Sequence, residues 1–197
     1  WRRMTALRML YERPDPSAPA MLQSLFQTTP RPETRIAALH ALKTAGALTA
    51  PQLIAALGDK HPRVRCHALR LAEPMMDSSP DLLTKVLELE SDADPVVQFQ
   101  LALTLGESID PRATQALAGI IARNAGQRDI VDAALTSIGT RAGDVLRQLL
   151  ANDNWVRNPH APQVLSAIVG QIVRQRHGTD MVVLIDALNA GNAGGGS

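Results

Sequence analysis

The single cysteine and the histidines are the side chains of this sequence that could bind a metal ion or act as nucleophiles. Cys66 stands alone, so an intrachain disulfide, a thiolate zinc cluster and a C-x-x-C-H haem attachment are excluded within the chain. No two histidines have the H-E-x-x-H spacing of zinc proteases. We expect a buried structural thiol at Cys66, with a reactive thiol as the alternative. We expect His61 to cap a helix or be solvated, and His40 and His67 to be ordinary packing or surface residues.

Acidic side chains are densest between residues 88 and 94, at Glu88, Glu90, Asp92 and Asp94. Alternating carboxylates could hold a hard cation, but this run lacks the spacing and the glycine of a calcium-binding loop. We therefore expect solvated carboxylates, with Asp94 acting as the N-cap of a following helix.

Basic residues form two separate clusters, Arg2, Arg3 and Arg8 at one end and Arg174, Arg176 and His177 near the other. The chain has 20 basic and 19 acidic residues, and 3% of its residues are aromatic. A nucleic-acid groove would ordinarily add a continuous basic stripe, often with aromatics for stacking, so no nucleic-acid partner is expected. A glycine-rich phosphate loop is also absent, and a small-molecule ligand is not expected. No apolar run approaches the roughly 20 residues of a transmembrane helix.

These side chains must be positioned by a repeated element, because four stretches of the sequence align with one another. They are RIAALHAL (35–42), RCHALRLA (65–72), QFQLALTL (98–105) and VDAALTSI (131–138). Their spacing of 30 to 33 residues is typical of two-helix repeats. Apolar columns recur at i, i+4 and i+8, which indicates one buried helix face. Weaker copies at the start of the chain and after Pro162 bring the expected number of units to about six.

Turn residues separate these stretches. Asp94, Asp110 and Ser79 each precede a proline and are predicted N-caps, while Gly46, Gly58, Gly106 and Gly139 are predicted left-handed C-caps. The second helix of each unit is predicted at 21–26, 53–57, 82–89, 116–121, 145–150 and 181–188. The sequence thus predicts an all-α solenoid of helical hairpins. We expect one repeat domain over residues 1–190, cut from a longer polypeptide, and a flexible glycine-rich tail over 191–197.

The segments KHPRVRCHALRLA (60–72) and DADPVVQFQLALTLG (92–106) resemble HEAT repeats, whose first helix commonly opens with Asp, Pro, Val and Arg. The resemblance implies a right-handed, armadillo-like superhelix. It also implies that Asp59 and Arg65 belong to the ladder of acidic and basic side chains that stack between HEAT units. Asp92 keeps the acid of the next unit. Gln98 replaces the expected arginine, so the ladder should be broken there.

A narrower resemblance covers nearly the whole chain. The phrases WRRMTALRMLY (1–11), HPRVRCHALRLAE (61–73), FQLALTLGE (99–107) and VLSAIVGQIVRQRHGTDMVVLIDAL (164–188) are similar to the HEAT region of exported bacterial PVC-type haem-binding CxxCH proteins. Such proteins carry a dehydrogenase-like β-propeller before the repeats and a c-type cytochrome domain after them. The resemblance implies a non-catalytic, periplasmic spacer that contacts its flanking domains or another protein. It implies no cofactor in this segment, with c-type haem elsewhere in the parent.

Two alternatives remain open from the sequence. One is a freestanding HEAT adaptor. The other is a HEAT-like nucleic-acid-binding or lyase enzyme, which would gather Glu88, Glu90, Asp144 or Asp186 around a pocket with an aromatic wall. Trp155 lies in NDNWVRN (152–158), between the last regular repeat and the degenerate one. We expect it to be buried at a change in helix packing, whereas an exposed indole would be a contact site.

Overall fold

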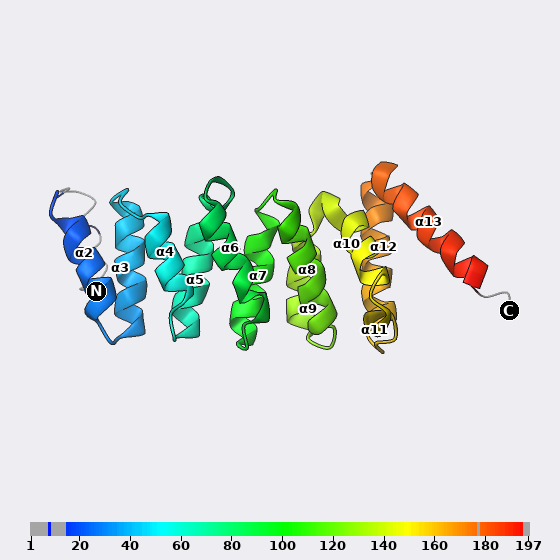
Figure 1. Ribbon diagram of the computed structural model, residues 1–197, viewed down its shortest axis with the longest axis horizontal. Coiled ribbons are helices and arrows are strands. Elements are labelled where there is room, and N and C mark those ends of the chain that lie inside the picture. Colours follow the sequence, from blue (N-terminus) through cyan, green and yellow to red (C-terminus); the bar gives the residue numbers. More distant parts are fainter. Residues whose placement is uncertain (1–7, 9–14, 177, 195–197) are drawn as a thin grey trace. The chain divides into compact units, whose positions relative to one another are not determined.

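The computed structural model describes residues 8, 15–176 and 178–194, and these residues form helices and connecting turns without any strand. The predicted all-α solenoid class is confirmed. The chain divides into two compact units, residues 1–89 and 90–197, each of which is described by itself. The helices follow one another as labelled in Figure 1.

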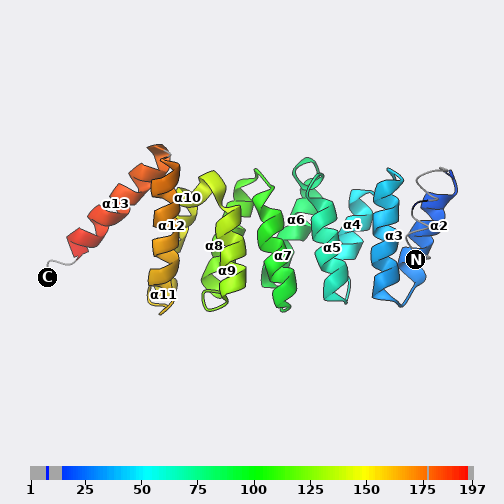
Figure 2. The same cartoon turned by 180° about the vertical axis from the view of Figure 1, so that it is seen from behind.

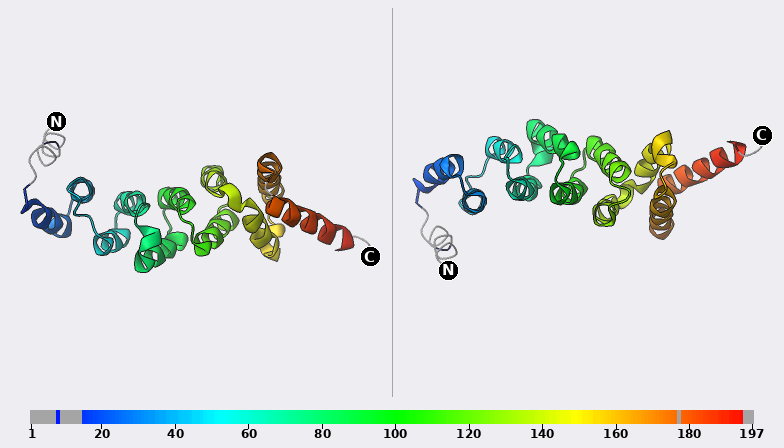
Figure 3. Two further views of the ribbon diagram at one scale, coloured as in Figure 1. Left: turned by 90° about the horizontal axis from the view of Figure 1, so that it is seen from above. Right: turned by 90° about the horizontal axis from the view of Figure 1, so that it is seen from below.

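The first unit contains two layers of helices. Its elements are α2 (Ala18–Thr28), α3 (Pro32–Thr44), α4 (Ala50–Leu57), α5 (Pro62–Ala72), a 3-10 turn (Met76–Ser78) and α6 (Pro80–Glu88). Helices α3 and α5 pack side by side in one layer, and α4 packs beside α6 in the other (Figure 3). The hairpin contacts between α2 and α3 and between α4 and α5 join the layers.

The second unit continues the same alternation and then departs from it. Its helices are α7 (Pro95–Gly106), α8 (Pro111–Arg123), α9 (Arg128–Ser137), α10 (Ala142–Leu150), α11 (Asp153–Val156), α12 (Ala161–Gln175) and α13 (Gly178–Gly194). Helices α7 and α9 lie side by side, as both Figure 1 and Figure 2 show, and α8 packs on α10. The short α11 interrupts the alternation, after which α12 and α13 both pack on α10.

The sequence repeats coincide with these layers. The four aligned stretches lie on α3, α5, α7 and α9, and the six predicted second helices lie on α2, α4, α6, α8, α10 and α13. The apolar columns are buried as expected, including Val64, Val97 and Ile130. Because the buried face recurs at the same positions, each helical repeat has the same kind of packing surface.

Capping was predicted better at the starts of the helices than at their ends. The Oδ1 atoms of Asp94 and Asp110 accept hydrogen bonds from backbone N–H groups of α7 and α8, whereas the Ser79 side chain makes no such bond. Gly46 and Gly139 have positive φ angles of 67° and 47°. Gly58, with φ of -89°, and Gly106 do not, so the predicted left-handed caps were wrong there, and Gly106 serves a different purpose. A Cβ there would lie 2.8 Å from the Ser137 Cβ, so glycine allows α7 and α9 to approach closely.

The C-terminal helix α13 extends to Gly194 and therefore includes the first four residues of the predicted tail. Extending an existing helix is easier than starting one, which offsets the poor helix propensity of glycine. Residues 195–197 lie outside the described part of the chain, and the division into one repeat domain and a tail stays a prediction. No described helix is long and apolar enough to cross a membrane.

Candidate protein-binding surface

A buried ion pair joins two neighbouring repeats of the first unit. Arg35 of α3 binds the carboxylate of Asp59, which lies in the turn before α5. The Nε–Oδ2 distance is 2.7 Å and the Nη2–Oδ1 distance is 3.0 Å. The two side chains are only 8% and 10% exposed. Asp59 Oδ1 also accepts the His61 backbone N–H at 2.8 Å, so one carboxylate fixes both the neighbouring helix and its own turn.

Equivalent side chains in three repeats donate to the carbonyl six residues earlier. Arg35 donates to Thr29 O at 3.0 Å, Arg65 to Asp59 O at 2.8 Å and Gln98 to Asp92 O at 3.1 Å. Gln98 therefore lacks the arginine's charge but keeps its hydrogen bond to the turn. Asp92 Oδ1 accepts the Asp94 N–H, as Asp59 does with His61. The assignment of Asp59, Arg65 and Asp92 to a ladder stays a prediction. Sequence reasoning missed Arg35, although it begins the first aligned stretch.

The structure places the other single residues in ordinary structural positions. Cys66 is buried. His61 caps α5, with its Nδ1 accepting the Arg63 backbone N–H at 3.3 Å. Trp155 is 3% exposed on α11, and its Nε1–H reaches no acceptor within the described part of the chain.

His40 and His67 form a pair that sequence reasoning treated as two unrelated residues. His40 Nε2 lies 2.9 Å from His67 Nδ1, and the rings meet edge to face. One nitrogen must donate and the other accept, so the contact requires at least one neutral ring. Burial lowers the pKa of both histidines, and nearby positive charge on Lys43 and Arg70 lowers the pKa of His40 further. The pKa of His67 is lowered additionally by His40 and Arg70.

The carboxylates that an enzyme would need are engaged locally. Glu88 pairs with Lys85 at 2.6 Å, Glu90 with Arg123 at 2.8 Å and Asp144 with Arg147 at 2.8 Å. Asp186 is exposed on α13. Within the described residues, no group of three or more His, Cys, Asp or Glu side chains could hold a metal ion. Of the basic clusters, Arg8, Arg174 and Arg176 are exposed, while Arg2, Arg3 and His177 lie outside the described residues.

An apolar groove of about 950 Å³ lies between α7 and α9 in the second unit. Its α7 wall is formed by Val96, Phe99 and Leu103, and its α9 wall includes Ala133 and Thr136. The Val96 side chain is 60% exposed and the Phe99 side chain 37% exposed. These exposed fractions are large for apolar residues, and the opposite face of α7 is already buried in the core of the unit. We name Val96, Phe99 and Leu103 the α7 stripe.

The groove is held by contacts at the C-terminal ends of both helices. Gly106 allows the close approach of α7 to Ser137 of α9. Arg141 then donates to Ser108 O and Ser137 O, each at 2.9 Å, and so ties the ends of the two helices together. The acceptors of the Arg141 hydrogen bonds are backbone carbonyls. The spacing of the groove walls therefore does not depend on exposed side chains.

The other repeats provide an internal comparison for the α7 stripe. Helices α5 and α9 carry mostly charged or polar residues at the aligned positions, which are Arg63, Cys66 and Arg70 on α5 and Asp129, Asp132 and Thr136 on α9. The repeat architecture therefore does not require apolar residues there. In the aligned stretches Phe99 shares a column with Cys66, but sequence reasoning did not compare the neighbouring positions. That comparison was the signal that could have revealed the stripe.

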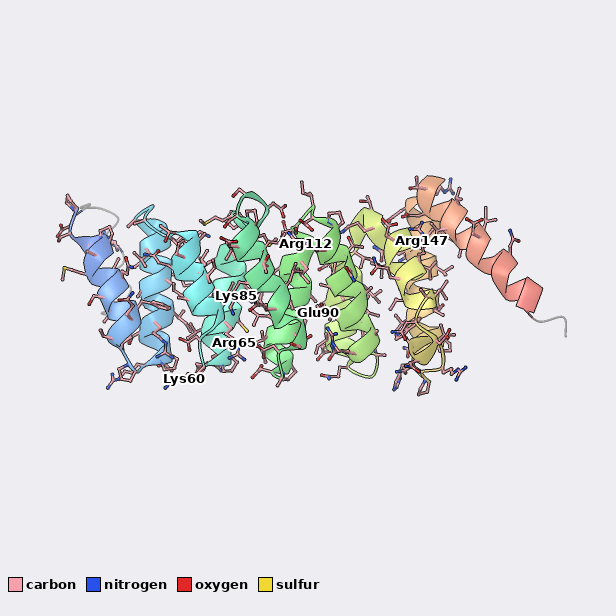
Figure 4. All side chains as sticks on the ribbon, viewed as in Figure 1. Lys60, Arg65, Lys85, Glu90, Arg112 and Arg147 are labelled. Atoms are coloured by element: carbon pink, nitrogen blue, oxygen red, sulfur yellow. The ribbon has the colours of Figure 1, made fainter. Side chains whose placement is uncertain are left out.

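Two grooves lined mostly by polar or charged residues adjoin the apolar one. One, of about 290 Å³, shares Pro95 and Gln127 with it and includes Glu90 and Arg123. Glu90 lies beside α8 (Figure 4), where the absence of a side chain at Gly119 leaves room for its carboxylate. The other, of about 500 Å³, shares Asp132 and Thr136 and extends to α12. The second unit thus has a continuous surface with an apolar centre and polar sides, as protein-binding surfaces commonly have.

Stacked helical hairpins define the fold of a helical-repeat protein. Residues 50–139, from α4 to the end of α9, match the family of HEAT repeats. These residues are similar to HEAT repeats, which supports that part of the expected resemblance. Neither the curated proteins nor the solved structures give a significant match.

Proposed function

We propose that this chain is a non-catalytic scaffold that binds protein through the surface of its second unit. HEAT repeats generally mediate protein–protein interactions, which supports this class of function. The observation that carries the proposal is the exposed α7 stripe beside a groove of about 950 Å³. Apolar side chains at such a place lower the free energy of the protein only when a partner removes them from water.

We further propose that the scaffold is a spacer within an exported, haem-binding, dehydrogenase-like polypeptide. Its support is the run of phrases that resemble the HEAT region of PVC-type haem-binding proteins. In that setting the partners are the flanking domains, c-type haem is bound elsewhere in the parent, and the protein is periplasmic. A freestanding adaptor is the second candidate, supported by the exposed stripe alone because any protein partner would satisfy it.

The parentage is tested by the visible absorption spectrum of the full-length parent, expressed with export and cytochrome maturation intact. A c-type haem band that sharpens on reduction is the expected result. A spectrum without any haem band would reject the redox context and leave the adaptor.

The binding function is tested by surface plasmon resonance with the 197-residue chain immobilised. The segments that precede and follow it in the parent are produced separately and injected, and saturable binding of at least one is expected. Absence of binding by both would reject the spacer. Tryptophan fluorescence during a titration with duplex DNA at low salt tests the nucleic-acid alternative, and no saturable change is expected.

A further inference from the structure

We propose that the groove between α7 and α9 docks an amphipathic α-helix of the partner, with apolar residues against the α7 stripe and basic residues beside Asp129 and Asp132. This inference rests on the proposed scaffold function and specifies which face binds and what chemistry it recognises. Three features support it: the spacing of the α7 stripe, the position of the stripe on a face of α7 that the core does not use, and the charge on the rim of the groove.

The α7 stripe has the spacing of a helix-binding ridge. Its members are at positions i, i+3 and i+7, so they lie on one side of α7 and span about 10 Å along its axis. Two turns of a partner helix have nearly the same length. Apolar residues of such a helix at i, i+3 or i+4, and i+7 can therefore contact the stripe along its whole length.

The core of the protein does not account for the stripe. Helix α7 already buries Val97, Leu101 and Leu105, each at 0% exposure, on its inner face. The stripe is a second apolar face on the same helix. On α5 and α9 the aligned face is mostly charged or polar, although those helices carry the same repeat pattern. Val96 and Phe99 are exposed and Leu103 is half-buried, and apolar residues at three such linked positions indicate contact with something outside the unit.

The rim of the groove has an excess of negative charge. Asp129 and Asp132 both line it and are exposed, and Arg128 is the only basic residue among its lining residues. Arg128 and Asp132 are 3.5 Å apart, with side chains 85% and 61% exposed. Such a solvated pair contributes little and exchanges partners easily. A helix with lysine or arginine beside its apolar face therefore suits this rim better than an acidic helix.

A helix fits the groove better than an extended strand. The walls are two neighbouring helices whose ends are held together by Arg141, so the space between them is a trough with helical ridges. Helices pack into such troughs by ridges and grooves. An extended peptide would need unpaired backbone groups to pair with, and the described residues contain no strand that could provide them.

The test uses two synthetic helical peptides of equal length and a fluorescent label on each. Both carry leucines at i, i+3, i+7 and i+10 on an alanine background, and one has three lysines where the other has three glutamates. Fluorescence anisotropy with the 197-residue chain is expected to show saturable binding of the lysine peptide and weaker binding of the glutamate peptide. This preference should shrink as salt is added, because the rim charges are exposed.

Two substitutions assign the binding to the groove. Phe99→Lys is expected to weaken binding of the lysine peptide at least about 10-fold, since it places a charge at the centre of the contact. Asp129→Lys should remove or reverse the preference for lysine. The matched control is Val173→Lys, which alters a 50% exposed valine on α12 that does not line the groove. It should leave both affinities unchanged. Far-UV circular dichroism and urea midpoints must agree among the variants.

Any of three peptide-binding results would overturn the inference: no saturable binding of either peptide, binding unaffected by Phe99→Lys, or equal affinities for the two peptides. Sedimentation of the chain as a dimer that Phe99→Lys dissociates would assign the groove to a second copy and also overturn it. Retained binding of a flanking segment by the Phe99→Lys variant would leave the scaffold function standing while rejecting this groove as its site. If the unaltered chain bound no flanking segment at all, that result would instead reject the scaffold function.

Discussion

Replacing Asp59 by alanine should destabilise the first unit more than replacing any comparable exposed carboxylate. The substitution leaves the Arg35 guanidinium, whose side chain is 8% exposed, without its anionic partner. Removing one member of a buried ion pair typically costs about 3–5 kcal/mol, because the remaining charge stays desolvated. The His61 N–H also loses its acceptor, which typically contributes about 1 kcal/mol. Since Arg35 keeps its bond to Thr29 O, we expect a total of about 3–5 kcal/mol.

The assay is urea unfolding followed by far-UV circular dichroism. Glu90→Ala is the matched control, because Glu90 and Arg123 are also joined at 2.8 Å but their side chains are 33% and 48% exposed. Solvent screening reduces the value of such a pair to about 0–1 kcal/mol. The two substitutions therefore remove the same kind of contact at nearly equal distances and differ mainly in burial.

A double-mutant cycle separates the pair from its surroundings. Arg35→Ala and Asp59→Ala together should cost clearly less than the sum of the single changes, because the second substitution removes the charge that the first left unpaired. The reasoning is refuted if Asp59→Ala costs no more than Glu90→Ala. It is also refuted if the two single changes are additive, since the residues would then not be coupled.

Further predictions concern Trp155 and the pair of histidines, His40 and His67. Trp155→Ala should cost about 3–5 kcal/mol in urea unfolding, because the indole is buried. Trp155→Phe should cost less than about 1.5 kcal/mol, because it keeps most of the ring and removes an N–H that has no acceptor among the described residues. A cost for Trp155→Ala under about 1 kcal/mol would contradict a core role. Because the pKa values of His40 and His67 are lowered on folding, the unfolded chain binds more protons, and stability should fall as pH drops below about 6.5. The double variant His40→Asn with His67→Asn should flatten this dependence in urea melts at stepped pH, and an unchanged slope would refute it.

The fold could be predicted because the same apolar pattern occurs several times, which chance produces far less easily than a single copy. A single apolar stripe such as RCHALRLA fits many helices, but four copies at nearly constant spacing identify both the helices and their buried faces. Contacts between copies were much less predictable. Asp59 pairs with Arg35, which lies 24 residues earlier, whereas the resemblance to HEAT repeats implied only that Asp59 and Arg65 belong to a ladder between units. Which neighbour a ladder residue reaches depends on the rotation of adjacent helices, and the period alone does not contain it.

The histidine pair illustrates the same limit. His40 aligns with Arg70, whereas His67 aligns with Ala37, so the two histidines occupy different columns one helical turn apart. Their nitrogens meet because α3 and α5 pack side by side. No property of either residue in the sequence reports that contact. Contacts of this kind become visible only when two helices are placed side by side.

The α7 stripe, in contrast, could have been found from the sequence by treating the repeats as controls for one another. Stacking fixes the inner columns, so Val64, Val97 and Ile130 all remain apolar and buried. The outer columns are free of that requirement, and at the position of Phe99 the sequence changes from cysteine to phenylalanine to aspartate along α5, α7 and α9. A departure at one outer position is ordinary variation. Three departures on one side of one helix, beside a groove whose walls are fixed by backbone contacts, indicate a surface specialised for binding.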